Sequence, residues 1–316
     1  MEFTLFEFFA NGAIVFCGNH TEEQGGFVFG TVSEQGIRAF AKPSGTDFIH
    51  IESEDFGNFE IEIGDCEPRA EEAETPVAIV RGIMNCFIES GNIFGGFDAK
   101  IVSEIPPKSK ISETAAFEIL IGKIISGLFF ENSVPALRLA QFGKIAEDDY
   151  FGRPSKLSER IISAIGKTVL LDFSDPEMPN WQEIDFDFGK TGYTAALISS
   201  EDFEEDYFET EKNLAFVAWN MGHNALSESD EAEFIAQFPI LREKCGEKAV
   251  HKALRYYEES RNALEEAEAL AMENFDEFLR IYSGSGNQNP VFVLEDSAGD
   301  FADEKEKQGF GILFVI

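Results

Sequence analysis

Short apolar runs, separated by glycines and polar residues, occupy the first part of the chain. Runs of this length that are rich in aromatic and β-branched side chains are typical of strands. We therefore predict strands at Phe3–Phe9, Ala13–Cys17, Phe27–Val32 and Phe48–Glu52, and another at Phe97–Ile105, which Pro106 and Pro107 end.

Apolar positions spaced three and four residues apart indicate a helix with one buried face. Such spacing first appears at Val77, Val80, Ile83, Met84, Phe87 and Ile88. Gly91 follows at the place where a helix C-cap commonly has glycine, so a helix is predicted over Thr75–Ser90. Further helices are predicted at Ser112–Phe130, Pro135–Tyr150 and Leu157–Ile165.

The second half of the chain repeats this mixture. Strands are predicted at Thr168–Phe173, Tyr193–Ser199 and Gly311–Ile316, and helices at Lys248–Leu270 and Asn274–Ile281. Ser229, which precedes two acids, is the predicted cap of another helix. The acidic run Glu201–Lys212 is interpreted as a solvated surface, and Ser283–Pro290 as a loop.

Strands and helices alternate without an internal repeat or a long linker. The length of 316 residues fits two ordinary domains of roughly 100–200 residues each. We predict an α+β protein with domains at residues 1–170 and 171–316, and a boundary close to residue 170.

The balance of charged residues argues against two classes of binding partner. Asp and Glu number 59 against 25 Lys and Arg, which gives a net charge of −34. Nucleic-acid binding needs a basic surface, and anionic membranes repel an acidic one, so we expect neither partner. A hydrophobic content of 44%, with 33 Phe, is enough to build a core.

Signals for membrane insertion and export are weak. The longest apolar run, Ile119–Phe130, contains Lys123 and is shorter than the roughly 20 residues of a membrane helix. Glu2 and Glu7 near the start do not fit a secretory signal. The four cysteines have no CxxC spacing, so we expect free thiols in a reducing cytoplasm and no zinc site.

Three stretches resemble signature motifs of the galactokinase family, which are sugar kinases of the GHMP class. Residues 10–26, ANGAIVFCGNHTEEQGG, are similar to APGRxxxxGxHTDxxxG. Residues 105–122, IPPKSKISETAAFEILIG, resemble the phosphate loop GSGLSSSAAFExLIG and its helix. Residues 146–160, AEDDYFGRPSKLSER, are similar to AENxxxGxPCGxMDQ. The motifs keep the family's order.

This resemblance implies a GHMP kinase fold, with an N-terminal domain of mixed sheet and helices and a ferredoxin-like C-terminal domain. It also implies transfer of a phosphoryl group from ATP, with Mg²⁺, to galactose or a related monosaccharide. Such a transfer depends mainly on positioning and on neutralising charge.

The resemblance places a sugar pocket at Asn19, His20, Glu22 and Tyr207. Glu22 stands where the family has Asp, and its longer side chain changes the reach of the carboxylate. Tyr207 lies in the acidic run and equally fits a surface aromatic. His20 taken alone fits a turn or core histidine.

The resemblance places the catalytic carboxylate at Glu159, where the family has Asp. The family's catalytic arginine falls on Ala13, which has no donor, and loss of such an arginine costs about 10³–10⁵ in rate. Arg160 replaces a Gln. It either pairs with Glu159, partly replaces the charge of the lost arginine, or forms an ordinary surface pair.

The phosphate loop departs most from the family pattern. Its nucleotide-binding positions fall on Lys108, Ser109, Lys110, Ser112 and Thr114, so that two lysines replace glycines. Glu113 adds a negative charge beside them. Thr114 and Glu147 are the magnesium ligands that the resemblance implies, although Glu147 also fits a solvated acid.

Both ends look short beside the family pattern. Residues 308–311, QGFG, resemble the last glycine motif, and the chain stops soon after them. A sheet edge exposed in this way favours a homodimer or a protein partner that covers it.

Three functions remain open on the sequence. The first is a galactokinase-like pseudoenzyme that keeps part of its sugar pocket and has weak or no ATP-dependent activity. The second is an active sugar kinase that uses Glu159 with Lys108 or Lys110. The third is a structural protein that binds neither ligand.

Overall fold

The computed structural model describes residues 4–106, 111–199, 207–285, 290–307 and 311–316. The chain forms two compact units. Unit 1 comprises residues 1–14 and 32–166, and unit 2 comprises residues 15–31 and 167–316. Residues 15–31 thus group with the C-terminal half, and the domain limits 1–170 and 171–316 stay a prediction.

Unit 1 is built on strands in the order β4 (Phe59–Glu62), β3 (Phe48–Glu52), β5 (Phe97–Ser103) and the second half of β2 (Phe27–Pro43). The β3–β5 pair is parallel, whereas β5 runs antiparallel to β2. Strand β1 (Phe6–Cys17) also pairs with β2. Both β1 and β2 are longer than the predicted strands.

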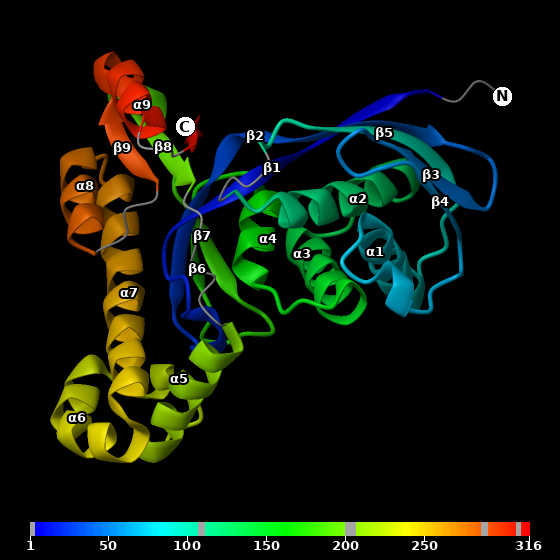
Figure 1. Cartoon of the computed structure of the whole chain (residues 1–316). Coiled ribbons are helices and arrows are strands. Elements are labelled where there is room, and N and C mark those ends of the chain that lie inside the picture. Colours follow the sequence, from blue (N-terminus) through cyan, green and yellow to red (C-terminus); the bar gives the residue numbers. More distant parts are fainter. Residues whose placement is uncertain (1–3, 107–110, 200–206, 286–289, 308–310) are drawn as a thin grey trace. The chain divides into compact units, whose positions relative to one another are not determined.

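Four helices cover one side of these strands (Figure 1). They are α1 (Pro76–Glu89), α2 (Glu113–Phe129), α3 (Ala136–Ile145) and α4 (Leu157–Ile165). Along β5, Phe97, Ala99 and Ile101 are buried while Lys100 and Val102 are exposed, so the helices cover one face and leave the other to solvent. All four helices were predicted from the sequence, the first of them from its apolar period.

The helix predicted at Pro135–Tyr150 changes its type along its length. It is α-helical to Ile145 and continues as a π-helix, η3 (Ala146–Phe151). Helix α1 approaches this turn closely at Gly82, where a Cβ atom would lie 2.7 Å from the Cα of Ala146. π-Turns inside helices are frequent at functional sites, and this one carries Glu147.

Unit 2 contains two sets of strands. The first half of β2 pairs antiparallel with β6 (Val169–Asp172), and β6 pairs with β7 (Asn180–Glu183). A separate antiparallel sheet has the order β10 (Gly311–Phe314), β8 (Tyr193–Ser199), β9 (Val291–Leu294). The fold is therefore α+β, as predicted, with a second small sheet near the C-terminus.

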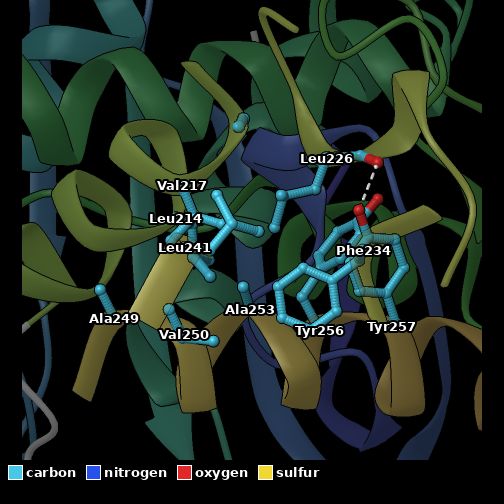
Figure 2. Packing of buried hydrophobic residues seen from close by; sticks show 11 residues of the cluster. Leu214, Val217, Leu226, Phe234, Leu241, Ala249, Val250, Ala253, Tyr256 and Tyr257 are labelled. Carbon is cyan, nitrogen blue, oxygen red and sulfur yellow. Dashed lines mark hydrogen bonds between the residues drawn. The ribbon is translucent and has the colours of Figure 1, made fainter. Parts of the chain in front are cut away.

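The helices of unit 2 are α5 (Tyr207–Met221), α6 (Glu231–Cys245), α7 (Glu247–Ala271), α8 (Phe275–Gly284) and α9 (Ala298–Lys307). Figure 2 shows the core that α5, α6 and α7 share, with Leu214, Val217, Phe234, Leu241 and Val250 packed together. A second, aromatic cluster joins Phe16, Phe29, Phe278, Tyr282 and Phe292.

Two local predictions in unit 2 need correction. The cap of α6 is Asp230, whose carboxylate accepts from the Glu233 N–H at 2.7 Å, so the prediction of Ser229 was wrong. The last part of the acidic run is the start of α5, where Glu209 and Lys212 are exposed as predicted but Thr210 is buried; its residues 201–206 lie outside the described ranges. Within those ranges no helix has the length and apolarity needed to cross a membrane.

Candidate functional site

The first motif forms the end of β1, a turn and the short helix η1 (Glu22–Gln24). Gly18 has a φ of +92°, and a Cβ atom there would lie 2.2 Å from the carbonyl oxygen of Phe27, so only glycine fits this turn. The buried Thr21 hydroxyl lies 3.0 Å from the Gly18 carbonyl and 2.7 Å from that of Phe27. The turn is thereby closed against β2.

Helix α7 fixes the same turn from the other side. The Asn19 N–H donates to Glu259 Oε2 at 2.9 Å, and the Tyr256 hydroxyl donates to the Gln24 carbonyl at 3.1 Å. The Ser260 hydroxyl accepts from the Phe27 N–H at 3.1 Å. Because these contacts hold backbone groups, the position of the Asn19–His20 segment is set by α7. The sequence motif contains none of these α7 residues.

His20 lines a small pocket within unit 2. The other lining residues come from α5 and α7 and are Thr210, Leu214, Lys252, Arg255, Tyr256 and Glu259. The pocket is partly open to solvent, and its polar lining groups could bind a polar group of a ligand.

The other predicted sugar-binding residues have different surroundings. Glu22 lies in η1 and is only 3% exposed. Tyr207 is the first residue of α5, and its side chain lies outside the described part of the structure. The structure therefore brings Asn19, His20 and Glu22 together on one turn, and the sugar-binding role of all four residues stays a prediction.

The predicted phosphate side lies in unit 1, at the start of α2. Ser112 precedes the helix and is half-buried, as is Thr114. The Glu113 carboxylate accepts a hydrogen bond from the Ser103 hydroxyl at 2.6 Å, so this acid stays at the positive end of the helix dipole. Lys108, Ser109 and Lys110 lie outside the described residues, as does most of the glycine motif at 308–311.

The predicted catalytic residue Glu159 lies in the first turn of α4 and is half-buried. No described residue donates a hydrogen bond to it. Ala13 on β1 is only 2% exposed and brings no charge. The catalytic role of Glu159 stays a prediction.

Arg160 does not pair with Glu159, and its partners come from two other elements. Its Nε lies 2.6 Å from Oε2 of Glu118 on α2, and its Nη2 donates to Oε1 of Glu118 at 3.0 Å. The same Nη2 contacts Oε2 of Glu147 on η3. Its Nη1 donates to the Lys156 carbonyl at 2.6 Å. We call Arg160, Glu118 and Glu147 the buried triad.

Burial changes the pKa values of the three side chains in this triad. Arg160 is 1% exposed, and its two partners are also buried or nearly so. Burial raises the pKa of Glu118 to about 8, against the opposing effect of Arg160. Burial also raises the pKa of Glu147, whereas for Arg160 the two carboxylates outweigh burial and raise its pKa. Two carboxyls share one guanidinium, so we assign the retained proton to Glu118, which shares a hydrogen bond with Glu147.

Gly143 on α3 leaves the space that the triad fills. A Cβ atom there would lie 2.7 Å from Oε2 of Glu118 and 3.1 Å from its Cβ. We expect Gly143→Ala to lower the free energy of unfolding by about 1–3 kcal/mol, because overpacking forces the triad to shift. Urea denaturation measures the change.

Gly95→Ala is the matched control, since its nearest neighbour would be an aromatic carbon at an ordinary 3.6 Å. We expect a change of about 0.5 kcal/mol or less for this variant. Equal losses for the two variants would contradict the packing argument.

The resemblance assigns Mg²⁺ to Thr114 and Glu147, and the triad tests that assignment. The Glu147 carboxylate already accepts from Arg160 and shares a hydrogen bond with Glu118. Among the described residues no group of three or more His, Cys, Asp or Glu side chains is placed to hold a metal ion. The residues present therefore do not fit a magnesium ion at Glu147.

Comparison with known proteins gives sequence relatives that are galactokinases. The chain is 29% identical to the galactokinase of Lactococcus lactis subsp. cremoris (strain MG1363) over 270 residues, which cover 81% of this chain and 66% of the relative. It is 26% identical to the galactokinase of Staphylococcus carnosus (strain TM300), with 88% of this chain and 72% of that relative covered. The chain thus spans about two thirds of the Lactococcus protein. No protein-family model matches it.

Solved structures share the fold. A crystal structure of Lactococcus lactis galactokinase complexed with galactose matches with a TM-score of 0.81 at 20% identity, covering 98% of this chain and 93% of that one. The mevalonate kinase of Methanococcus jannaschii matches with a TM-score of 0.60 at 14% identity, covering 99% and 98%.

Proposed function

We propose that this chain, a homologue of galactokinases with the GHMP kinase fold, binds galactose or a related monosaccharide and phosphorylates it slowly or not at all. The homology over most of the chain supports the sugar-kinase part of this proposal. The anchored turn at Asn19 and His20 supports the sugar-binding part, because residues held from several sides suit recognition.

One observation is the main support for the proposed loss of activity. The position that matches the family's catalytic arginine is Ala13, which is buried and uncharged. An arginine that stabilises the transferring phosphoryl group contributes about 10³–10⁵ to the rate. Glu113 works in the same direction, since its carboxylate lies where a helix N-terminus would otherwise attract phosphate.

An active sugar kinase is the second candidate. Glu159 is half-buried and no described residue donates to it, which suits a carboxylate that receives a proton from a sugar hydroxyl. Lys108 or Lys110 would then supply the positive charge that Ala13 lacks.

The test combines a binding and a turnover measurement. We expect millimolar galactose to raise the melting temperature of the chain, and His20→Ala to abolish that rise. His251→Ala is the control, because His251 is an exposed histidine of the same unit. Turnover of ATP in the presence of galactose should fall at least about 10³-fold below that of Lactococcus lactis galactokinase assayed in parallel.

Turnover within tenfold of that enzyme would contradict the proposal and favour the active kinase. The absence of any galactose or ATP effect on the melting temperature would favour a structural protein. A normal galactose effect in His20→Ala would contradict the placement of the sugar at this turn.

A further inference from the structure

The buried triad holds a positive charge of the protein at the place where the family pattern implies a metal ion. Arg160 is 1% exposed and makes contacts to Glu118, Glu147 and the Lys156 carbonyl. The three side chains come from α4, α2 and η3 of unit 1. The arrangement is thus a built part of that unit's interior.

We propose that the ion pair between Arg160 and Glu147 occupies the Glu147 carboxylate, so that this chain binds no divalent cation at Glu147. The proposal rests on the proposed function, since only kinship with sugar kinases gives Glu147 a magnesium-binding counterpart. It adds a cause of weak phosphoryl transfer that is independent of Ala13.

The hydrogen bonds of Glu147 support this proposal. One of its oxygens contacts the guanidinium, and the carboxylate also shares a hydrogen bond with Glu118. Mg²⁺ demands near-ideal octahedral coordination by oxygens and usually keeps several water molecules. A carboxylate that is already neutralised and 13% exposed offers it little charge and little room for water.

Electrostatics adds a second obstacle. A divalent ion at Glu147 would stand next to the guanidinium in a buried place, where like charges repel more strongly than in water. Arg160 cannot lose its proton to relieve this repulsion, because arginine stays protonated in proteins. Thr114 lies one helical turn before Glu118 on α2, so the second implied ligand is on the same helix face as a member of the triad.

Glutamine, the residue in the motif that positions 146–160 resemble, would behave differently. It is neutral, so it could not offset the charge of the Glu147 carboxylate, which would then need another cation. Arg160→Gln should therefore open the position to a metal.

The experiment titrates the full chain with Mn²⁺ alone, followed by electron paramagnetic resonance, in the wild type, Glu147→Gln, Arg160→Gln and the Arg160→Gln/Glu147→Gln double variant. We expect identical titrations for wild type and Glu147→Gln, since only weak surface sites then bind. Arg160→Gln should gain one site at least tenfold tighter than any wild-type site, and the double variant should lose it.

Mn²⁺ binding by the wild type that Glu147→Gln removes would overturn the proposal. A folded Arg160→Gln chain without the new site would overturn it as well. If Arg160→Gln does not fold, the comparison of wild type with Glu147→Gln decides alone. A galactose melting shift measured on the same samples tests the proposed function separately, because that shift does not depend on Mn²⁺.

Discussion

Replacing Arg160 by alanine is expected to lower the free energy of unfolding by about 3–5 kcal/mol at neutral pH. Arg160 is the cation of the buried triad, and Glu118 and Glu147 lie against it inside unit 1. Removing one partner of a buried ion pair leaves the other charges unpaired in a medium that solvates them poorly. Urea denaturation of the full chain measures the loss.

The control is Arg153→Ala. Arg153 is 54% exposed and pairs with the exposed Glu74, and an exposed ion pair contributes about 0–1 kcal/mol. If the two alanine variants differ by less than about 1 kcal/mol, the fold does not depend on the charge of Arg160 inside the triad.

A triple variant separates the cost of unpaired charge from the value of the pair itself. Arg160→Met combined with Glu118→Leu and Glu147→Met replaces all three groups by apolar ones of similar size. Buried ion pairs replaced in this way are often as stable as before, or more stable by about 1–4 kcal/mol. We therefore expect the triple variant to recover most of the stability that Arg160→Ala loses.

Most helices and several strands follow directly from the apolar pattern. Leu157–Ile165 is α4 to the residue, and Phe48–Glu52 is β3. The strand β9, Val291–Leu294, is an apolar run that was not predicted. Two other missed elements have no such pattern: β7 is Asn180–Glu183, with all four residues exposed, and α9 is polar apart from one phenylalanine. These elements exist because of their neighbours, so their own sequence does not reveal them.

The buried triad shows why the contacts of site residues were harder to predict from the sequence than the helices and strands. Two of the three interpretations of Arg160 paired it with Glu159, its neighbour in sequence. Adjacent side chains on a helix do not face each other, and the partners in the structure are 42 and 13 residues away. One signal was present: Glu118 interrupts an apolar run, and a carboxylate on a buried helix face needs a partner.

The same signal applies to α7 in unit 2. Glu259 and Glu266 lie on its buried face with Ala263, Ala267 and Leu270. Glu259 finds partners in the Asn19 N–H and Arg255. Glu266 is 0% exposed, and no described residue forms a hydrogen bond with either of its carboxyl oxygens. A charge at this position would therefore be strongly unfavourable.

Glu266 is expected to make the stability of the chain fall as pH rises. Burial, reinforced by Glu259 and Glu265, raises its pKa from 4.5 to about 8; Cys17, whose pKa is raised mainly by burial, faces the same region. Between these two values the unfolded chain has lost a proton that the folded chain keeps. Stability due to this group is then complete below about pH 4.5 and lost above about pH 8, with a slope of up to about 1.4 kcal/mol per pH unit.

Glu266→Gln should remove this slope, because glutamine is neutral in both states. Denaturant unfolding of the wild type, Glu266→Gln and Glu268→Gln between about pH 5 and pH 9 tests this, and the exposed Glu268 provides the control. Glu118, whose pKa is also about 8, contributes a slope of the same sign to all three proteins, so only the difference between the curves reports on Glu266. Parallel curves for wild type and Glu266→Gln would show that the buried carboxyl finds a partner or water on titration. A steeper wild-type curve would show that the buried carboxyl on α7, the helix that anchors the Asn19–His20 turn, makes the stability of the chain depend on pH.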